Sequence, residues 1–263
     1  MQQCELIALI EQTAPLHHAA SWDHSGIQVA SGRERITHLA VCLDPAPDSV
    51  RAALAAGADM ILAHHPLSMS PRYPDKLDAY HDVVSLLIRA DVPLYSAHTS
   101  LDVNPEGPVG WAARELGLLD LRVLEPADGD GGFGFGLCGT LPAPLSGEAI
   151  LARLEPWLKE GQRTLAGPDA PDAVTILAIC PGSGGSMIEA ASKQGATLML
   201  TGDVKYHVAL ESPISVIDVG HFALEEEMMR RFAATLAESV SVTFIPGRDP
   251  LRPLKSCNVK TSL

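Results

Sequence analysis

Apolar positions in this chain form short continuous runs that alternate with segments of helical periodicity. The runs at 60–63 and 198–201 contain no charged residue and indicate strands buried on both faces of a largely parallel sheet. Residues 1–15 carry Glu5 and Glu11 inside an apolar periodicity, which predicts an amphipathic helix rather than a signal peptide. The pattern as a whole predicts an α/β protein.

One segment of the chain is repeated. Residues 40–62 align without a gap on residues 178–200, and each copy predicts a strand, a loop, a helix that ends at Gly57 or Gly195, and a second strand. After a third predicted strand, each half has a histidine followed four residues later by a carboxylate. We therefore expect two similar α/β lobes related by internal pseudo-symmetry.

The predicted lobes comprise residues 1–125 and 146–263, with a linker region at 126–145. Because the linker region is rich in glycine and proline and lacks a clear period, it is interpreted as a linker or a set of short strands. Ser146 is expected to cap the helix that follows it, and residues 82–90 predict an additional helix in the first lobe.

The 263 residues include 19 Lys and Arg against 32 Asp and Glu, which gives a formal net charge of −13. An acidic surface lacks the positive patch that binds a phosphate backbone, and anionic lipid repels it. The longest apolar runs are far shorter than the roughly 20 residues of a membrane-spanning helix. We expect a soluble protein without a nucleic-acid or membrane partner.

The five cysteines contain no CxxC pair and leave one thiol unpaired under any disulfide scheme. This favours reduced thiols and a cytoplasmic location. Cys42 and Cys180 lie within apolar strand patterns, where a packing role is expected.

Polar residues cluster after three predicted strands, at the strand ends where open α/β sheets bind ligands. The clusters are His64 with His65, His98 with Asp102, and His221 with Glu225. In the first cluster, Pro66 ends the strand directly after the two histidines, so both imidazoles can turn into one cavity. The alternative is one buried and one exposed imidazole.

The spacing of His221 and Glu225 places both on one helix face, where they can bind the same ion or neighbouring ions. The ordinary alternative is a solvated acidic first turn, the fate expected for Glu226 and Glu227. Because the clusters follow corresponding strands of two related halves, the repeat would bring them together. The donors would then exceed the three ligands of a mononuclear catalytic zinc and suit two ions sharing a bridging carboxylate and water. These donors are His64, His65, Asp102, His221 and Glu225.

Mixed nitrogen and oxygen ligation, without a thiolate nearby, is typical of catalytic rather than structural sites. The cofactor expected is a pair of divalent ions drawn from Zn, Fe, Mn, Co and Ni.

Several long motifs resemble the NIF-three-like family, whose bacterial members are labelled GTP cyclohydrolase 1 type 2 homologs. They occur in the family's order and span most of residues 20–235. The motifs are SWDHSGIQVAS, GADMILAHHPL, LYSAHTSLDVNPEGPVGWAARELGL, GSGGSMIEAASKQGATLMLTGDVKYH and VIDVGHFALEEE.

This resemblance implies the short family form with two α/β lobes, a dinuclear metal site in each subunit, and assembly into a toroidal homohexamer. The five donors above match the family's metal ligands, with Glu225 as the bridge. His98 falls in a matching motif and is placed beside the metals without being counted as a ligand.

Three positions depart from the family pattern. His24 stands where the family usually has Asn, Asp203 replaces Glu, and Leu224 replaces Thr. None removes a ligand, but Leu224 cannot donate a hydrogen bond that would orient one. His24 is interpreted as a polar replacement for Asn rather than a site residue.

Two further segments are candidates for contacts to an anionic substrate. The loop at 181–186 precedes a helix but lacks the Lys of a P-loop, so it is interpreted first as a tight turn and second as an anion contact. Lys205 and His207 are candidate substrate-binding residues. The alternative is that both are exposed on a short helix.

The leading hypothesis is a metal-dependent hydrolase that acts on a nucleotide-like small molecule, with His98 as the catalytic residue that transfers a proton. The family label implies a cyclohydrolase acting on GTP. The alternative is a metal-handling or metal-insertion protein, or a scaffold, whose ions are cargo or structural.

Overall fold

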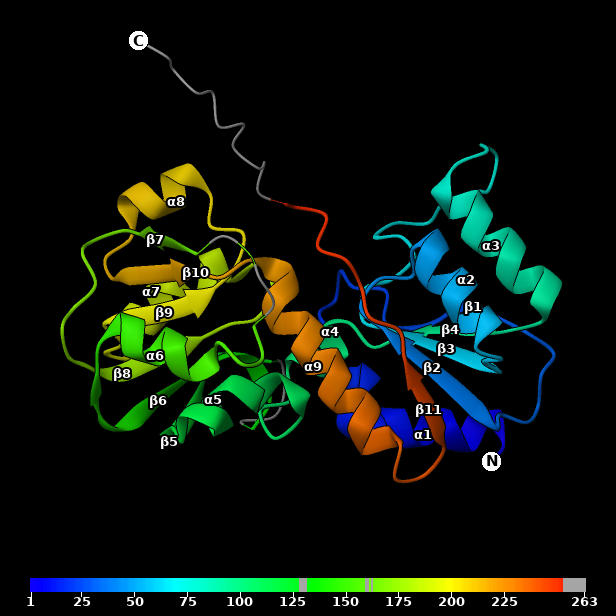
Figure 1. Cartoon of the computed structure of the whole chain (residues 1–263), viewed down its shortest axis with the longest axis horizontal. Helices are drawn as coiled ribbons and strands as arrows, with labels where there is room; N and C mark the ends of the chain where they lie inside the picture. Colours follow the sequence, from blue (N-terminus) through cyan, green and yellow to red (C-terminus); the bar gives the residue numbers. More distant parts are fainter. Residues whose placement is uncertain (128–131, 159–160, 162, 253–263) are drawn as a thin grey trace, which may run out of the picture.

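The computed structural model describes residues 1–127, 132–158, 161 and 163–252. Within these ranges the chain forms two β-sheets, with helices outside and between them (Figure 1). In the same ranges, no helix combines the length and apolar composition needed to span a bilayer.

The first sheet has a parallel centre formed by the N-terminal half of the chain. Strand β2 (His38–Cys42) pairs with β3 (Met60–Ala63), and β3 pairs with β4 (Leu94–Ser96). At the edges, β1 (Gly26–Val29) is antiparallel to β4, and β11 (Ser241–Phe244) is parallel to β2. Every residue of β3 and β4 is buried, so the prediction of strands covered on both faces is confirmed here.

The second sheet also has a parallel centre, formed by β8 (Val174–Ile179), β9 (Leu198–Thr201) and β10 (Ser215–Asp218) in that order. Antiparallel strands flank this centre on both sides. They are β5 (Leu119–Pro126), β6 (Gly134–Leu145) and β7 (Thr164–Ala166).

The predicted order of strand, helix and strand is confirmed in both halves. Helix α2 (Pro47–Ala55) connects β2 to β3, and α7 (Ile188–Lys193) connects β8 to β9 after the short 3-10 helix η3 (Gly184–Met187). The additional helix predicted for the first half is α3 (Ala79–Ala90), and α8 (Tyr206–Glu211) lies between β9 and β10 in the second.

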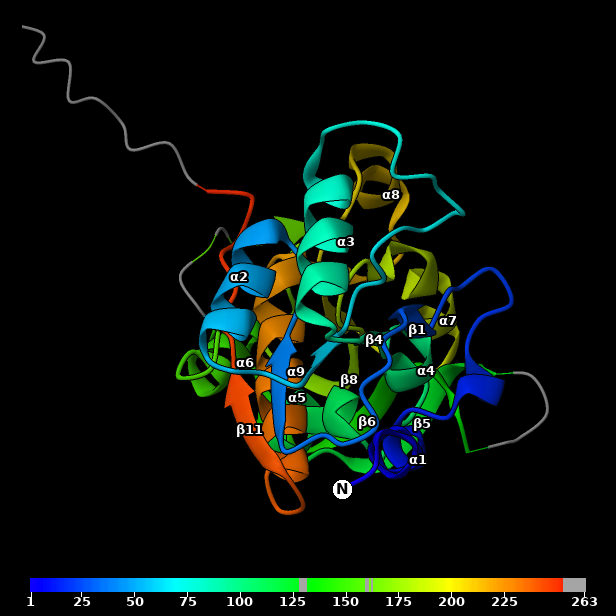
Figure 2. The same ribbon diagram turned by 90° about the vertical axis from the view of Figure 1, so that its right-hand side faces the viewer.

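Each sheet has its own hydrophobic cluster on its outer face. Helices α2 and α3 cover one face of the first sheet, where Val50 and Leu87 pack with Ile61 of β3, and Figure 2 shows both helices above the strands. On the second sheet, Ile188 of α7 packs with Met199 of β9.

Helix α9 (His221–Leu236) lies between the two sheets (Figure 1). Its Phe232 belongs to a hydrophobic core that also contains Leu62 of β3 and Leu200 of β9, so one core extends from sheet to sheet. Other helices in the described ranges are α1 (Gln3–Thr13), α4 (Thr99–Asp102), α5 (Trp111–Leu116), α6 (Gly147–Leu154), and the 3-10 helices η1 (Leu16–His18) and η2 (Pro108–Gly110). Ser146 caps α6 as predicted, because its hydroxyl accepts the Ala149 N–H at 3.2 Å.

Each sheet contains strands from more than one of the predicted regions. Most of the predicted linker region is the long strand β6, and β11 leaves the predicted second lobe to join the first sheet. The glycine content that suggested a linker has a packing reason: a Cβ on Gly139 would lie 2.9 Å from the Leu119 carbonyl oxygen of β5. Strand β11 changes sheets because α9 carries the chain back to β2.

Candidate metal centre

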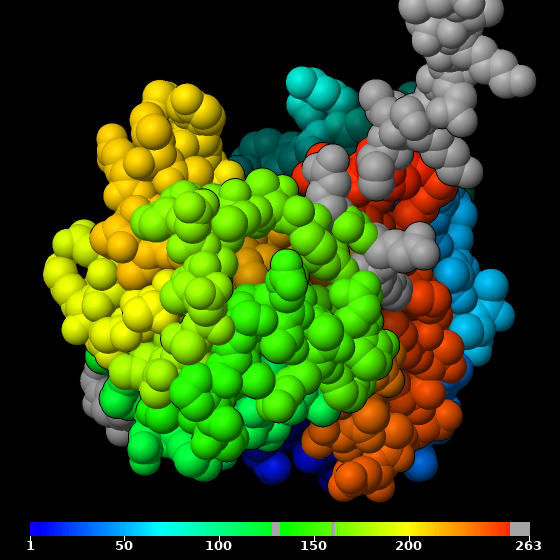
Figure 3. Space-filling model, turned by 60° about the vertical axis from the view of Figure 1, so that its left-hand side comes forward, coloured from blue at the N-terminus to red at the C-terminus, as the bar shows by residue number. Residues whose placement is uncertain are grey.

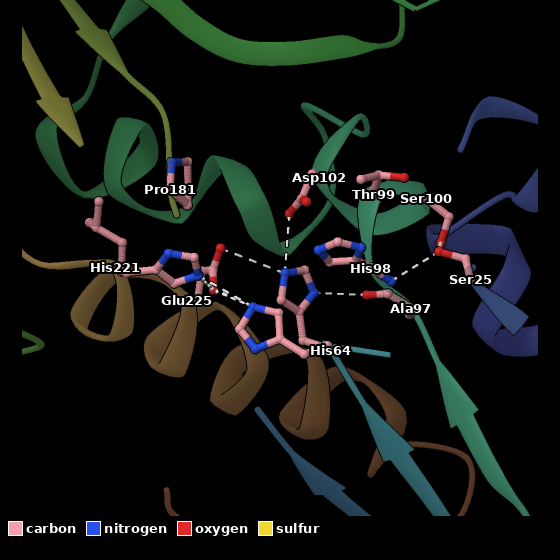
Figure 4. Close-up of polar contacts among 12 residues, drawn as sticks. Ser25, His64, Ala97, His98, Thr99, Ser100, Asp102, Pro181, His221 and Glu225 are labelled. Atoms are coloured by element: carbon pink, nitrogen blue, oxygen red, sulfur yellow. Dashed lines mark hydrogen bonds and ion pairs between the residues drawn. The ribbon is translucent and has the colours of Figure 1, made fainter. Parts of the chain in front are cut away.

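Six side chains converge where strands of the first sheet end against the first turns of α9, and Figure 4 labels all of them except His65. Strand β3 ends directly before two of them. Two more follow β4, one as the N-cap residue of α4 and one as the last residue of that helix. The remaining two lie one turn apart at the start of α9. The six are His64, His65, His98, Asp102, His221 and Glu225.

The carboxylate of Glu225 lies among three imidazoles. Its Oε2 is 2.8 Å from His221 Nε2 and 3.2 Å from His65 Nε2, and its Oε1 is 3.7 Å from His64 Nε2. Asp102 Oδ1 lies 3.6 Å from His64 Nε2. The Nε2 atoms of His65 and His221 are 3.3 Å apart, a separation at which two ring nitrogens need a proton or a cation between them.

Each imidazole of the cluster is held through its Nδ1 atom. With the Nδ1–H donating to an oxygen, the lone pair is on Nε2, which faces the cluster. The pairs are His64 with the Ala97 carbonyl at 2.8 Å, His65 with Asp44 at 2.7 Å, His98 with Asp23 at 2.7 Å, and His221 with Asp203 at 2.8 Å.

Asp23 is the most extensively bonded of these acceptors. It also accepts the Ser25 hydroxyl at 2.6 Å, the Thr99 N–H at 3.1 Å and the Thr99 hydroxyl at 2.5 Å. Burial raises the pKa of Asp23, but the hydrogen bonds from His98, Ser25 and Thr99 outweigh it and hold the pKa well below its ordinary value. Asp23 is therefore an anion that fixes the ring of His98.

Burial and neighbouring charge set the protonation of the centre. Burial raises the pKa of Glu225, but His64 and hydrogen bonds from the imidazoles hold it well below its ordinary value. Burial lowers the pKa values of His65 and His221, but hydrogen bonds to carboxylates raise them to about 10 and about 9. Burial raises the pKa of Asp102. Without metal, His65 and His221 thus hold protons that a cation would displace.

The donor set fits a metal. His64 Nε2 and Asp102 Oδ1 are buried without a hydrogen-bond partner among the described residues, an arrangement that is costly unless a cation satisfies both. Two groups have donor atoms within 4.8 Å of one another. They are His64 with His65 and His98, and His65 with His221 and Glu225.

Two cavities reach the cluster. The larger cavity has a volume of about 920 Å³ and is lined by His65 and His221. Figure 3 shows a hollow on this side of the molecule, where the β10–α9 region (orange) is bordered by the β7 region (yellow-green). The smaller, of about 380 Å³, is lined by His98, Asp102, His221 and Glu225. Solvent and a small ligand can therefore approach the donors.

All five predicted metal donors lie together, and His98, which was predicted to lie beside the metals without being a ligand, joins them. Lys205 and His207 are not brought to the cluster: both are exposed at α8, and neither lines either cavity. His24 is also exposed and lies outside the cluster.

The expectation that Glu226 and Glu227 are solvated was wrong. Their exposed fractions are 2% and 4%, because α9 lies between the sheets and its first turns have little solvated surface. Glu227 accepts hydrogen bonds from Arg230 and Arg231, and Glu226 accepts the Gly247 N–H at 2.8 Å.

The loop at 181–186 forms a turn into η3, and it packs on the centre. A Cβ on Gly182 would strike Glu225 Oε1. Cys180, expected only to pack, follows β8 and lines the smaller cavity. Burial raises its pKa to about 12, so it is a neutral thiol.

Sequence reasoning missed the carboxylates that hold the imidazoles. Asp44 and Asp203 each lie two residues after a parallel strand, so the rule that found the histidines could have found them too. Asp23 has no such signal, because it precedes β1 in an irregular segment and only the fold brings it to His98.

The fold and the cluster define an α/β protein with two sheets and a candidate metal centre where they meet. The chain belongs to the Duf34/NIF3 (NGG1p interacting factor 3) family, whose model matches residues 1–250. Among curated relatives, a GTP cyclohydrolase 1 type 2 homolog from Streptomyces coelicolor is 30% identical over 89% of this chain and 85% of its own. A second relative with that name, from Nostoc sp., is 34% identical over 74% of this chain and 76% of its own.

Solved structures show the same fold. Reduced HcgD from Methanocaldococcus jannaschii is 26% identical, with a TM-score of 0.80 over 93% of this chain and 98% of its own. Staphylococcus aureus hypothetical protein SA1388 is 23% identical, with a TM-score of 0.87 over 97% of this chain and 99% of its own. At this identity the match supports the fold alone.

Proposed function

We propose that this protein is a hydrolase that uses two metal ions to act on a nucleotide-like small molecule. The observation that carries the proposal is the placement of Glu225: Oε2 faces His65 and His221, whereas Oε1 faces His64. A carboxylate can bind two ions through its two oxygens, whereas an imidazole Nε2 has one lone pair and binds one ion. Glu225 is therefore suited to bridge two ions.

The remaining donors are consistent with this division. Asp102 faces His64, on the side of Glu225 Oε1, and His221 and His65 face Oε2. Two divalent ions drawn from Zn, Fe, Mn, Co and Ni would polarise a substrate oxygen and make a water molecule more acidic. The name that the curated relatives carry makes GTP the first substrate to test.

We assign proton transfer to His98. It lines the smaller cavity, and Asp23 fixes its ring so that Nε2 is free to accept a proton and return it. In His98→Gln we expect metal content to be retained and kcat to fall about 100-fold or more. Loss of metal from this variant would instead make His98 a ligand.

Elemental analysis tests the metal centre. We expect about two ions per chain in the wild type and fewer in His64→Ala and Glu225→Ala. His207→Ala is the matched control, because it removes an exposed imidazole outside both cavities and should keep the wild-type stoichiometry. Unchanged metal content in the first two variants would overturn the assignment.

A substrate screen tests the hydrolase. Metal-loaded protein would be incubated with GTP, other nucleotides and phosphoesters, and the products separated by chromatography. We expect a metal-dependent product that Glu225→Ala does not form. Metal-loaded protein that leaves every compound intact would count against a hydrolase.

One observation favours a metal-handling function as the second candidate. His221 and its partner Asp203 have side chains that are 31% and 42% exposed, so one end of the cluster is open to solvent. Rapid transfer of the metal to a metal-free acceptor protein, without turnover of any compound, would support this function. Tightly held metal with turnover would support the hydrolase.

A further inference from the structure

The smaller cavity has the candidate ligands on one side and an apolar surface on the other. His98, Asp102 and Glu225 line it together with Trp22 and Phe135. Its volume of about 380 Å³ is at the lower end of the range of small-molecule sites.

Trp22 is the most prominent part of the apolar surface. It is 59% exposed, so its indole presents a large flat apolar surface on which an aromatic ring can stack. Its ring meets the ring of His98 edge-on, with centroids 6.1 Å apart, so the indole lies beside the candidate metal centre. The neighbouring Asp23 is fixed by Ser25 and Thr99, which holds the Trp22 backbone in place.

Apart from the imidazoles of the cluster, the polar part of the cavity is uncharged or acidic. Ser183 and Ser186 line it, and neither hydroxyl bonds another described residue, so both can donate to or accept from a ligand. The ionisable lining residues outside the cluster are Glu125 and the neutral Cys180, and no lysine or arginine of the described chain lines the cavity. A phosphate chain would therefore find no lysine or arginine side chain here.

The larger cavity is less suited to an aromatic ring. Its lining includes four aspartates and, apart from the two imidazoles of the cluster, one aromatic side chain, Phe222. The aspartates are Asp44, Asp203, Asp218 and Asp249.

We propose that the smaller cavity binds the planar heteroaromatic ring of the substrate, stacked on Trp22, and leaves any phosphate outside. This inference rests on the proposed function and names the part of the substrate that enters the site. The ring edge meets Ser183 and Ser186, and the reacting atoms face the donors of Glu225 and Asp102. Stacking accepts any flat ring, whereas the hydroxyls select among ring edges.

Calorimetric titration of the full-length, metal-loaded protein tests the proposal. The probes are guanosine and cytidine, which have a ring without phosphate, and ribose 5-phosphate, which has phosphate without a ring. We expect at least one nucleoside to bind and ribose 5-phosphate to bind much more weakly. Trp22→Ala should weaken nucleoside binding roughly 10- to 100-fold, and Trp22→Phe, which keeps a flat ring, by only about threefold.

Tyr206→Ala is the matched control, because Tyr206 is 76% exposed but lines neither cavity. It should bind nucleosides like the wild type. The proposal is overturned if neither nucleoside binds, if Trp22→Ala binds like Tyr206→Ala, or if ribose 5-phosphate binds as tightly as the nucleosides. Metal content measured on the same samples distinguishes failure of this proposal from failure of the metal centre. If the protein holds its metal but nucleoside binding does not depend on Trp22, only the proposed ring-binding role of the smaller cavity is refuted.

Discussion

Gly182 is the position at which one methyl group should disturb the candidate metal centre. Its φ of +68° is one that L side chains rarely adopt, and a Cβ there would strike Glu225 Oε1. In Gly182→Ala the carboxylate must therefore retreat by roughly 1 Å to reach van der Waals separation. Because metal–ligand distances tolerate only about 0.2 Å, Oε1 would be lost as a ligand. We expect at least a tenfold loss of metal affinity, on the order of 1.4 kcal/mol.

Gly57→Ala separates this contact from backbone strain. Gly57 has a φ of +79° and open space where a Cβ would lie, so the variant has the strain without the clash. Both variants should lose about 1–2 kcal/mol of unfolding free energy in urea, measured without metal. Metal would be counted by elemental analysis after dialysis, and its affinity measured by competition with a chelator. Equal metal affinity in the two variants would refute the reasoning.

The remaining predictions concern pH, stability and assembly. Since hydrogen bonds to carboxylates raise the pKa values of His65 and His221 to about 10 and about 9, both are protonated at pH 7 without metal. Metal affinity should therefore rise with pH until about pH 10, and calorimetry in two buffers should count at least two protons released per chain; no release would contradict this. Glu227→Ala should cost about 1–3 kcal/mol in urea unfolding, because Arg230 and Arg231 lose their shared carboxylate. Native mass spectrometry should detect six chains, and a monomer alone would contradict the proposed homohexamer.

The sequence predicted the parts of the fold that local patterns determine. The repeated strand, helix and strand units could be found because continuous apolar runs and terminal glycines such as Gly57 are local signals. The pairing of β11 with β2 could not, since it depends on the path of α9 between the sheets. The burial of Glu226 escaped prediction for the same reason, as an acidic first turn has the same sequence pattern whether solvent or protein covers it.

In the candidate site, too, local sequence patterns predict some contacts, whereas others depend on tertiary structure. The four-residue spacing of His221 and Glu225 is set by the helix, and their contact at 2.8 Å follows from it. The acceptors that hold each Nδ1 atom come from other strands or loops, so no spacing along the chain connects Asp23 with His98. The meeting of Trp22 with the centre likewise depends on tertiary structure.

The position before Glu225 shows how the fold can replace a missing hydrogen bond. Leu224 stands where a hydroxyl could orient the neighbouring ligand, yet its side chain is fully buried in the core shared by both sheets. Its carbonyl accepts the Nε1–H of Trp111, on α5, at 3.0 Å. This bond holds the backbone of α9 within one residue of Glu225, and the loop at Gly182 limits the carboxylate from the other side. Packing of α9 and of that loop therefore orients Glu225 without a hydroxyl at position 224.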